Sequence, residues 1–496
     1  MKIALINPSP IIGENEEFYA QKWPPLGILL LGTILKKQGY QIRLLDQASN
    51  GFSFEKVFEW IKRVDPDVVG ITSFTVGFLS CIKISQMIKK WNPNIKIVLG
   101  HYHASICADK ILEKYNHLID YCVRGENEYI LSNLISFLEK DSTREPTDIL
   151  GLSYSFNGKI KRNPDCPINK NLDELPFIDR SLLKFPYRMN IAGLEVSDSK
   201  LATAFFTRGC PYSCTYCSVS KFSNRQYRSK TPERMVDEFA YLASKGYREI
   251  AFVDDNFSFN VPNVVKFCRL LRKEKIDINW HAEMRVDGLS RHLFSQMVSA
   301  GCKSISFGIE SANERILKYY NKKITSDMSL KAIKMAKDAS MDFLIGLFMV
   351  GAPYETLSEC ENTINFALKS GVDFFFLNVV EAWEGIPMWD DLVSRGLIDP
   401  GSTNRLGIEN WETTTRVMDL THTEAQTEWV LSMIRKAYRK FLSFRSLKML
   451  PSFLLSPYKR ELSFSFMKNL ENGMRTFGRL RNLKLSGFGK YTTKKD

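Results

Sequence analysis

Two series of alternating strand and helix patterns constrain the fold of this chain more than any other feature of its sequence. In the first series, amphipathic helical patterns separate short β-branched runs at 2–6, 41–46, 67–73, 95–99 and 119–124. Such alternation is typical of parallel sheets, because parallel neighbours need a crossover connection. We predict a doubly wound, Rossmann-like α/β domain over 1–145, with its ligand crevice at the carboxyl ends of the strands.

A turn-rich stretch, 146–198, separates the two series and is predicted to form a hairpin and a linker. The second series has six strand patterns, at 201–207, 248–253, 278–284, 303–309, 342–350 and 372–379. Six units are too few for the closed eight-stranded barrel. We therefore predict an open, partial (β/α)6 barrel over 199–400, followed by a basic helical C-terminal region over 401–496.

The net charge of +13 is concentrated near the C-terminus. Residues 431–496 contain 16 Lys or Arg and three acidic residues, interleaved with aromatic side chains. Two interpretations are open: a helical end whose aromatics pack on the main body, or a segment that contacts an anionic membrane surface or an acidic partner. No apolar run is long enough to span a bilayer, so we expect a cytoplasmic protein, peripheral at most at the inner face of the membrane. No module typical of nucleic-acid binding is found, so no nucleic-acid partner is expected.

Three of the ten cysteines are clustered. Cys210, Cys214 and Cys217 follow the first strand pattern of the second series. Three thiolates suit an iron-sulfur cluster or zinc. Structural zinc takes a fourth ligand, and residues 218–247 contain neither His nor Cys. The spacing therefore favours one 4Fe-4S cluster whose fourth iron stays open.

The pattern C-x-x-x-C-x-aromatic-C, with Tyr216 as its aromatic residue, resembles the radical S-adenosylmethionine (SAM) superfamily. The resemblance implies that SAM binds the open iron and is cleaved by one electron to a 5′-deoxyadenosyl radical. It places Tyr216 near the adenine. It also implies an external electron donor such as flavodoxin or ferredoxin.

Further SAM contacts are implied after successive strands. Asp254 and Asp255 stand where the superfamily usually carries a Gly-Gly-Glu motif that receives the SAM ammonium, and Arg285 is assigned to the SAM carboxylate. Glu310 and Ser311 are assigned to the ribose or methionine part. Gly351 and Pro353 are assigned to a turn that lies beside the adenine of SAM. Taken singly, each residue is also compatible with a helix cap or an ion pair.

The first half resembles the cobalamin-binding radical SAM group, through Trp23-Pro-Pro25-Leu-Gly27, Leu99-Gly100-His-Tyr-His103 and Gly125-Glu-Asn-Glu128. Cobalamin is thus implied as a cofactor, with Ser73, His101 and His103 in its crevice. The Asp-x-His-x-x-Gly motif that supplies an axial imidazole is absent. His101 stands where the group tends to have a second glycine, so a vestigial domain without cobalamin is the alternative.

The leading functional hypothesis is C-methylation of an unactivated carbon in a large apolar, lipid or isoprenoid-like substrate. Radical oxidative cyclisation, as in the anaerobic porphyrin-ring cyclases, is the alternative within enzymes. A cobalamin or iron-sulfur sensor without turnover is the alternative from another class. Methylthiolation needs further cysteine motifs, and the seven remaining cysteines contain no close pair.

Overall fold

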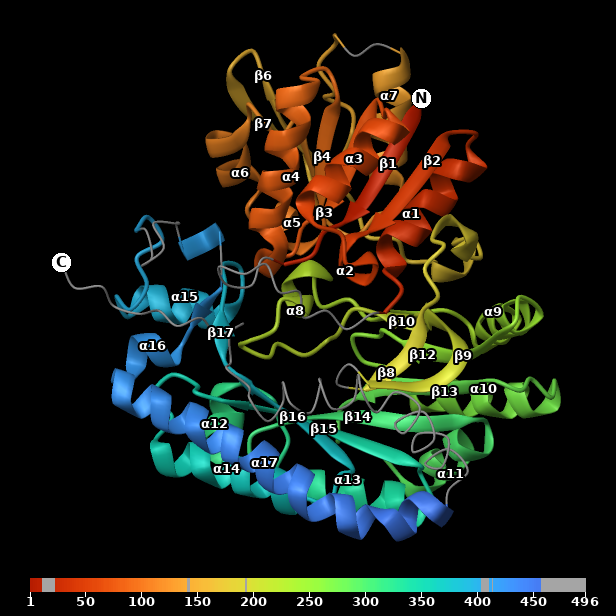
Figure 1. Ribbon diagram of the computed structural model, residues 1–496, viewed down its shortest axis with the longest axis vertical. Helices are drawn as coiled ribbons and strands as arrows, with labels where there is room; N and C mark the ends of the chain where they lie inside the picture. Colours follow the sequence, from red (N-terminus) through yellow and green to blue (C-terminus); the bar gives the residue numbers. More distant parts are fainter. Residues whose placement is uncertain (11–22, 141–142, 192–193, 403–409, 413, 456–496) are drawn as a thin grey trace.

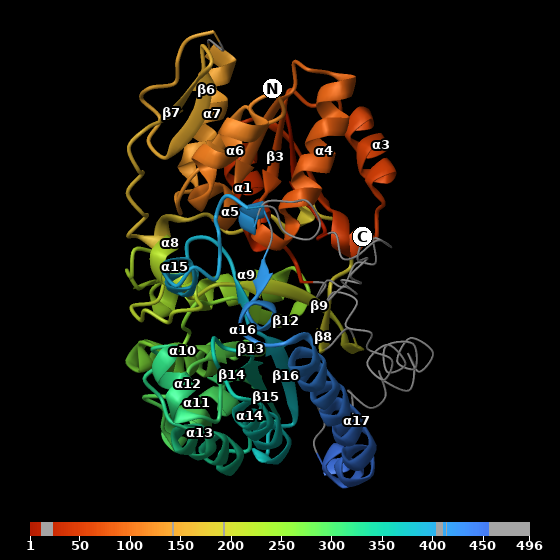
Figure 2. The same ribbon diagram turned by 90° about the vertical axis from the view of Figure 1, so that its left-hand side faces the viewer.

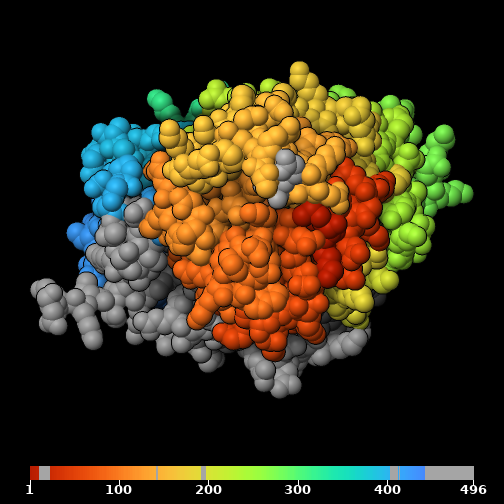
Figure 3. Space-filling view, turned by 90° about the horizontal axis from the view of Figure 1, so that it is seen from above, coloured from red at the N-terminus to blue at the C-terminus, as the bar shows by residue number. Residues whose placement is uncertain are grey.

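The computed structural model describes residues 1–10, 23–140, 143–191, 194–402, 410–412 and 414–455. Within these residues the chain forms two large sheets, each flanked by helices and stacked one above the other (Figure 1). The predicted fold class is confirmed: a doubly wound α/β domain, a partial barrel and a helical C-terminal region. Seen from above, the first domain, in red to orange, covers much of this face of the molecule (Figure 3).

Five strands of the first sheet are parallel, in the order β2-β1-β3-β4-β5: β1 (Lys2–Asn7), β2 (Gln41–Asp46), β3 (Val68–Thr72), β4 (Lys96–Gly100) and β5 (Tyr121–Val123). The helices of this domain are α1 (Leu26–Lys37), α2 (Gln47–Asn50), α3 (Phe54–Val64), α4 (Phe78–Trp91), α5 (Tyr102–Ile106), α6 (Ala108–Tyr115) and α7 (Tyr129–Lys140). The strand order reverses direction between β1 and β3, and ligands of such sheets bind at that point.

The predicted hairpin is present and extends the first sheet. Its strands, β6 (Leu152–Phe156) and β7 (Lys159–Arg162), are antiparallel, and β6 pairs with β5. Asn157 and Gly158 connect them with φ angles of 50° and 73°. Positive φ at both central residues is what a two-residue hairpin turn requires.

The second sheet has the order β16-β15-β14-β13-β12-β9-β8. Six of its strands are parallel and only β8 is antiparallel. Their bounds are β8 (Arg188–Ile191), β9 (Leu194–Ala204), β12 (Tyr247–Phe252), β13 (Asn279–Met284), β14 (Cys302–Glu310), β15 (Phe343–Val350) and β16 (Phe374–Val379). Helices line its outer side: α9 (Pro232–Ser244), α10 (Val261–Lys273), α11 (Arg291–Ser299), α12 (Glu314–Tyr319), α13 (Ser326–Asp338) and α14 (Leu357–Lys369).

Short elements complete the described chain. They are α8 (Val219–Phe222), α15 (Pro387–Ser394), α16 (Met418–Thr421), the ribbons β10 (Thr207–Arg208) with β11 (Arg228–Ser229) and β17 (Glu381–Ala382) with β18 (Thr415–Arg416), and the 3-10 turns η1 (Thr75–Gly77), η2 (Leu172–Glu174), η3 (Arg180–Leu182) and η4 (Asn410–Glu412). The ribbon of β10 and β11 encloses the loop that carries the three clustered cysteines.

The long C-terminal helix α17 (Glu424–Leu455) packs beside α14 and against β16, on the outer side of the partial barrel (Figure 2). The Tyr438 hydroxyl accepts a hydrogen bond from the Leu377 amide at 2.9 Å, and the Phe441 ring lies 4.7 Å from that of Phe375. These two aromatics of the basic segment therefore pack on the main body. The remainder of the basic segment, 456–496, lies outside the described residues. In the described part of the chain, no helix is long and apolar enough to cross a membrane.

Candidate active site

The cysteine loop begins at a glycine that no other residue can replace without rearrangement. Gly209 has a φ of 77°, and a Cβ atom on it would lie 2.1 Å from the Gln226 carbonyl oxygen. The loop therefore turns back against β11 immediately before Cys210. The loop follows β9 and β10 and ends at the short helix α8. Because it follows the end of β9, the cysteines lie at the carboxyl edge of the second sheet.

The three predicted metal ligands lie together at this edge. Cys214 is buried, and Cys210 and Cys217 are half-buried. Burial raises the pKa of the Cys217 thiol to about 12, and the neighbouring Cys214 acts in the same direction. The Asn256 amide lies 3.7 Å from the Cys210 sulfur, and the Arg285 guanidinium 4.0 Å from the Cys214 sulfur. The loop thus carries three neighbouring thiols, with hydrogen-bond donors near two of them. Within the described residues no group of three or more His, Cys, Asp or Glu side chains is arranged to hold a metal ion, so cluster binding by these three cysteines stays a prediction.

The two aspartates after β12 hold the cysteine loop. The Asp254 carboxylate accepts hydrogen bonds from the amides of Phe206 and Thr207 at 2.8 and 3.0 Å. Asp255 accepts one from the Gly209 amide at 2.6 Å. Burial raises the pKa of Asp254 to about 7. Both carboxylates are therefore engaged with backbone in this structure, and contact with the SAM ammonium stays a prediction.

Two buried ion pairs surround the cysteine loop. Arg285 pairs with Asp287 at 2.7 Å, and Lys322 pairs with Glu310 at 2.7 Å. The Tyr216 hydroxyl donates to the same Glu310 oxygen at 3.0 Å. Glu310 has a φ of 69°, a left-handed conformation rare outside glycine. The structure thus brings Tyr216, Arg285 and Glu310 together, and it adds Lys322, which no sequence motif indicated.

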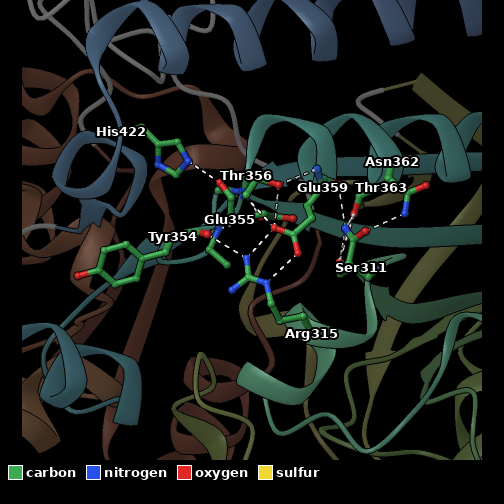
Figure 4. Close-up of polar contacts among 12 residues, drawn as sticks. Ser311, Arg315, Tyr354, Glu355, Thr356, Glu359, Asn362, Thr363 and His422 are labelled. Carbon is green, nitrogen blue, oxygen red and sulfur yellow. Dashed lines mark hydrogen bonds and ion pairs between the residues drawn. The ribbon is translucent and has the colours of Figure 1, made fainter.

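The turn after β15 is fixed by a buried carboxylate (Figure 4). Glu355 accepts hydrogen bonds from the amides of Gly351 and Ala352 at 2.7 and 2.9 Å, and its own carbonyl accepts one from His422 Nε2 at 2.6 Å. Gly351 has a φ of 85°, and a Cβ atom there would lie 2.3 Å from Met418. Pro353 is buried in the same turn. The structure shows a rigid, glycine-dependent turn at the predicted position.

Ser311 follows the end of β14 and faces helix α14. Its hydroxyl is 3.1 Å from the Thr363 hydroxyl on α14 (Figure 4). Arg315 and Glu359 form an ion pair at 2.6 Å nearby. The Ser311 hydroxyl therefore ties the end of β14 to α14, and a ribose contact stays a prediction.

A cavity of about 180 Å³ lies at the carboxyl edge of the first sheet, at the reversal between β1 and β3. Trp23 and Phe74 line it, and the Trp23 Nε1 atom is buried without a hydrogen-bond partner among the described residues. Ser73 links the neighbouring strand ends: its amide donates to the Gly100 carbonyl, and its carbonyl accepts from the His103 amide. The cavity therefore lies where the strand order predicts a ligand.

Both candidate histidines adjoin this edge. The His101 ring lies 4.0 Å from that of Phe74, and the His103 Nδ1 atom is 3.2 Å from the Thr75 hydroxyl. Burial lowers the pKa of His101 to about 4 and that of His103 to about 3, so both rings are neutral at neutral pH. His101 has φ 82° and ψ −168°, a region that glycine adopts far more readily. His101 Nδ1 and His103 Nε2 are buried without a partner within the described ranges.

The two edges face each other and are joined by ion pairs. Glu126, after β5, lies 2.8 Å from Arg228 and 3.4 Å from Arg208, and Glu128 also pairs with Arg208. Arg208 stands two residues before Cys210. The Tyr102 ring lies 4.4 Å from that of Phe222 on α8. We call Glu126, Glu128, Arg208 and Arg228 the interdomain ion-pair cluster.

Comparison with known proteins agrees with this geometry. The Radical SAM superfamily matches residues 205–367, and the B12 binding domain matches residues 19–135. An uncharacterized methyltransferase, PH0819, of Pyrococcus horikoshii is 30% identical over 89% of this chain and 92% of its own. An anaerobic magnesium-protoporphyrin IX monomethyl ester cyclase of Rubrivivax gelatinosus is 28% identical over 79% and 70%. The hopanoid C-3 methylase of Methylococcus capsulatus is 26% identical over 70% and 64%.

Two solved structures share the fold. OxsB, a cobalamin-dependent SAM radical enzyme with aqua-cobalamin and SAM bound, aligns with a TM-score of 0.67 at 18% identity over 96% of this chain and 72% of its own. TsrM of Kitasatospora setae, with cobalamin and a 4Fe-4S cluster, aligns with a TM-score of 0.63 at 16% identity over 79% and 75%. Fold, motifs and matched domains together define a radical SAM enzyme with a B12-binding domain.

The chain belongs to the cobalamin-binding radical SAM family, as its motifs predicted. Its cofactors are therefore those of the family: a 4Fe-4S cluster, SAM and cobalamin. The residues present fit these groups. Three adjacent cysteines are available to the cluster, and the unpartnered polar atoms of Trp23 and His101 are of the kind that a ligand rich in amides satisfies.

Proposed function

We propose that this enzyme is a cobalamin-dependent radical SAM methyltransferase acting on an unactivated carbon. The observation that carries the proposal is the direct apposition of the B12-domain edge and the cysteine loop, held by the interdomain ion-pair cluster. When bound, the cofactors supply a carbon-centred radical and a methyl group. The relative PH0819 is described as a methyltransferase, which supports the same reaction.

In this proposal the protein chain positions the cofactors and shields them from solvent. Cys210, Cys214 and Cys217 hold the cluster, and Asp254 and Asp255 keep their loop in place. Tyr216 and Lys322 fix the Glu310 carboxylate at the mouth of the barrel. Fixed dipoles and ion pairs of this kind orient reactants without reorganising during the reaction.

Transfer of a labelled methyl group tests this function. With deuterated-methyl SAM, cobalamin, a reductant and an extract of the producing cells, the intact enzyme should form 5′-deoxyadenosine and a product that carries the label. Formation of 5′-deoxyadenosine with an unlabelled, ring-closed product would instead favour oxidative cyclisation, the activity for which the Rubrivivax relative is named. Cobalamin binding without SAM cleavage would favour a sensor.

A membrane-associated lipid substrate is the narrower form of the proposal. It is supported by the name of the hopanoid methylase relative and by residues 456–496, where ten Lys or Arg stand against three acidic residues. An external flavodoxin or ferredoxin would deliver the electrons.

Vesicle sedimentation tests the membrane contact. The intact chain should sediment with anionic vesicles at low salt and be released as salt rises, because each basic residue near such a surface contributes at most about 1 kcal/mol, which salt screens. A chain ending at residue 455 should stay in the supernatant. A chain that ends near residue 430 would be unsuitable for this test, because it would lack Tyr438 and Phe441, which belong to the core. Equal sedimentation of both chains would contradict the prediction.

A further inference from the structure

Three aromatic side chains form a continuous row beside the cysteine loop. The ring centroids of Tyr212 and Phe259 are 6.3 Å apart, edge to face at 89°, and those of Phe259 and Tyr227 are 4.7 Å apart. Phe259 is 46% exposed, and the two tyrosines are half-buried. We call Tyr212, Phe259 and Tyr227 the aromatic row. Its composition is that of a protein contact, because aromatic residues are enriched in protein interfaces.

The aromatic row adjoins Cys210 through two separate segments. Tyr212 stands two residues after Cys210 in the cysteine loop. Phe259 follows β12 instead, and its amide donates to the Asn256 carbonyl at 3.4 Å. The Asn256 side chain lies 3.7 Å from the Cys210 sulfur. Asn256 therefore connects the exposed Phe259 to a predicted ligand of the cluster.

The end of the loop that carries Cys217 faces the first domain. Cys217 leads into α8, whose Phe222 ring lies 4.4 Å from that of Tyr102. Arg208, which precedes the loop, belongs to the interdomain ion-pair cluster. These contacts occupy that side of the loop, whereas the aromatic row belongs to the second domain and includes exposed surface. A protein partner therefore has access to the loop at the row.

The exposed side chains beside the aromatic row that lack a partner are positive. The nearby carboxylates are engaged: Asp287 pairs with Arg285 at 2.7 Å, and Asp255 accepts a backbone amide at 2.6 Å. Lys221 and Arg225 lie on the segment that leads from the cysteine loop to β11, and both are exposed. Among the described residues, neither side chain has a hydrogen bond or an ion pair. Unpaired positive charge beside apolar surface steers the approach of an acidic partner.

We propose that the aromatic row, flanked by Lys221 and Arg225, is the docking surface of the electron donor, a small acidic redox protein. The inference rests on the proposed function and names where the partner of the same site binds. One electron passes from the reduced donor to the oxidised cluster, so the donor is oxidised and the cluster is reduced by one electron, and no bond or proton moves. Electron-transfer encounters use small interfaces, so one exposed ring with two flanking cations provides a sufficient contact.

Anaerobic stopped-flow reduction of the cluster tests this inference. The enzyme carries its cluster but no substrate, reduced flavodoxin is the donor, and loss of the cluster's visible absorbance reports the arrival of the electron. Lys221→Glu combined with Arg225→Glu should lower the second-order rate constant by about tenfold or more, because it reverses the charge that steers docking. Phe259→Ala should lower it several-fold, and rising salt should lower it for the intact enzyme. Dithionite, a small reductant that needs no docking surface, should reduce every variant at nearly the intact rate.

Lys245→Glu combined with Lys275→Glu is the matched control. Both lysines are exposed, and they stand where α9 and α10 end, at the edge of the second sheet opposite the cysteine loop. Lys275 has a φ of 51°, close to the 55° of Arg225, so the two double variants make the same charge change in similar backbone. The control should accept electrons from flavodoxin like the intact enzyme.

Equal reduction by flavodoxin of the intact enzyme and of the variants at Lys221, Arg225 and Phe259 would overturn the inference. Slower reduction of these variants by dithionite would also overturn it, because the substitutions would then act on the cluster itself. So would failure of flavodoxin to reduce an intact enzyme that dithionite reduces. Absence of methyl transfer would refute the proposed function instead, and it would leave this measurement interpretable, since only the cluster is followed.

Discussion

Simultaneous replacement of Cys210, Cys214 and Cys217 by Ala should abolish both the broad absorbance near ~400 nm and the reductive cleavage of SAM. These are the only cysteines of the described chain gathered in one loop, so no other set is placed to hold the cluster. Anaerobic reconstitution, with iron determination and chromatography of 5′-deoxyadenosine, measures both properties. The loss of SAM cleavage should be complete, because the electron that cleaves SAM reaches it through the cluster.

The control for this experiment is Cys166→Ala. Cys166 is half-buried and stands apart from the loop, so its replacement should leave iron content and SAM cleavage unchanged. Retention of a 4Fe-4S spectrum by the triple variant would show that other cysteines hold the cluster. Retention of secondary structure, measured by circular dichroism, separates loss of the cluster from loss of the fold.

Gly209→Ala should reduce cluster occupancy to below about a tenth of that of the intact chain and destabilise the fold by a few kcal/mol. The new Cβ atom would lie 2.1 Å from the Gln226 carbonyl oxygen and 2.9 Å from Ser223 Cβ, so the backbone beside Cys210 must move. Iron content per chain and the thermal midpoint measure the two effects.

Gly158→Ala is a matched control for Gly209→Ala. Gly158 has a φ of 73°, close to the 77° of Gly209, but no atom lies within 4 Å of its Cβ position. Its replacement should cost only about 1 kcal/mol, from backbone strain alone, and leave the cluster in place. Equal loss of iron in both variants would show that the collision with Gln226 is not the cause.

The fold was predictable where the hydrophobic pattern is local and regular. The run 41–46 coincides with β2, and Asn157-Gly158 forms the predicted hairpin turn. Two features were missed. Helix α7 was not predicted, although its buried positions follow a helical period. The helical pattern at 104–115, between the strand runs 95–99 and 119–124, forms two helices and not one, α5 and α6, because Cys107 has a φ of −103° and a ψ of 17° and interrupts the helical backbone.

The site was predictable only where its residues are neighbours in sequence. The cysteine loop is one uninterrupted segment, so its spacing carries the signal. Lys322 follows α12 in the chain and pairs with Glu310, which precedes that helix. Arg228 pairs with Glu126, 102 positions earlier in the sequence. Neither pair belongs to a local sequence motif, so neither could be predicted.

The interdomain ion-pair cluster gives the two cofactor sites a direct physical connection. Arg208 contacts the loop after β5 on one side and leads into Cys210 on the other, so ordering either loop orders its neighbour. A coupling free energy belongs to both sites: if cobalamin changes the affinity for SAM, SAM changes the affinity for cobalamin by the same factor. Measuring the affinity for SAM with and without cobalamin, in the intact enzyme and in Arg208→Ala, would show how much of such a coupling passes through the ion-pair cluster.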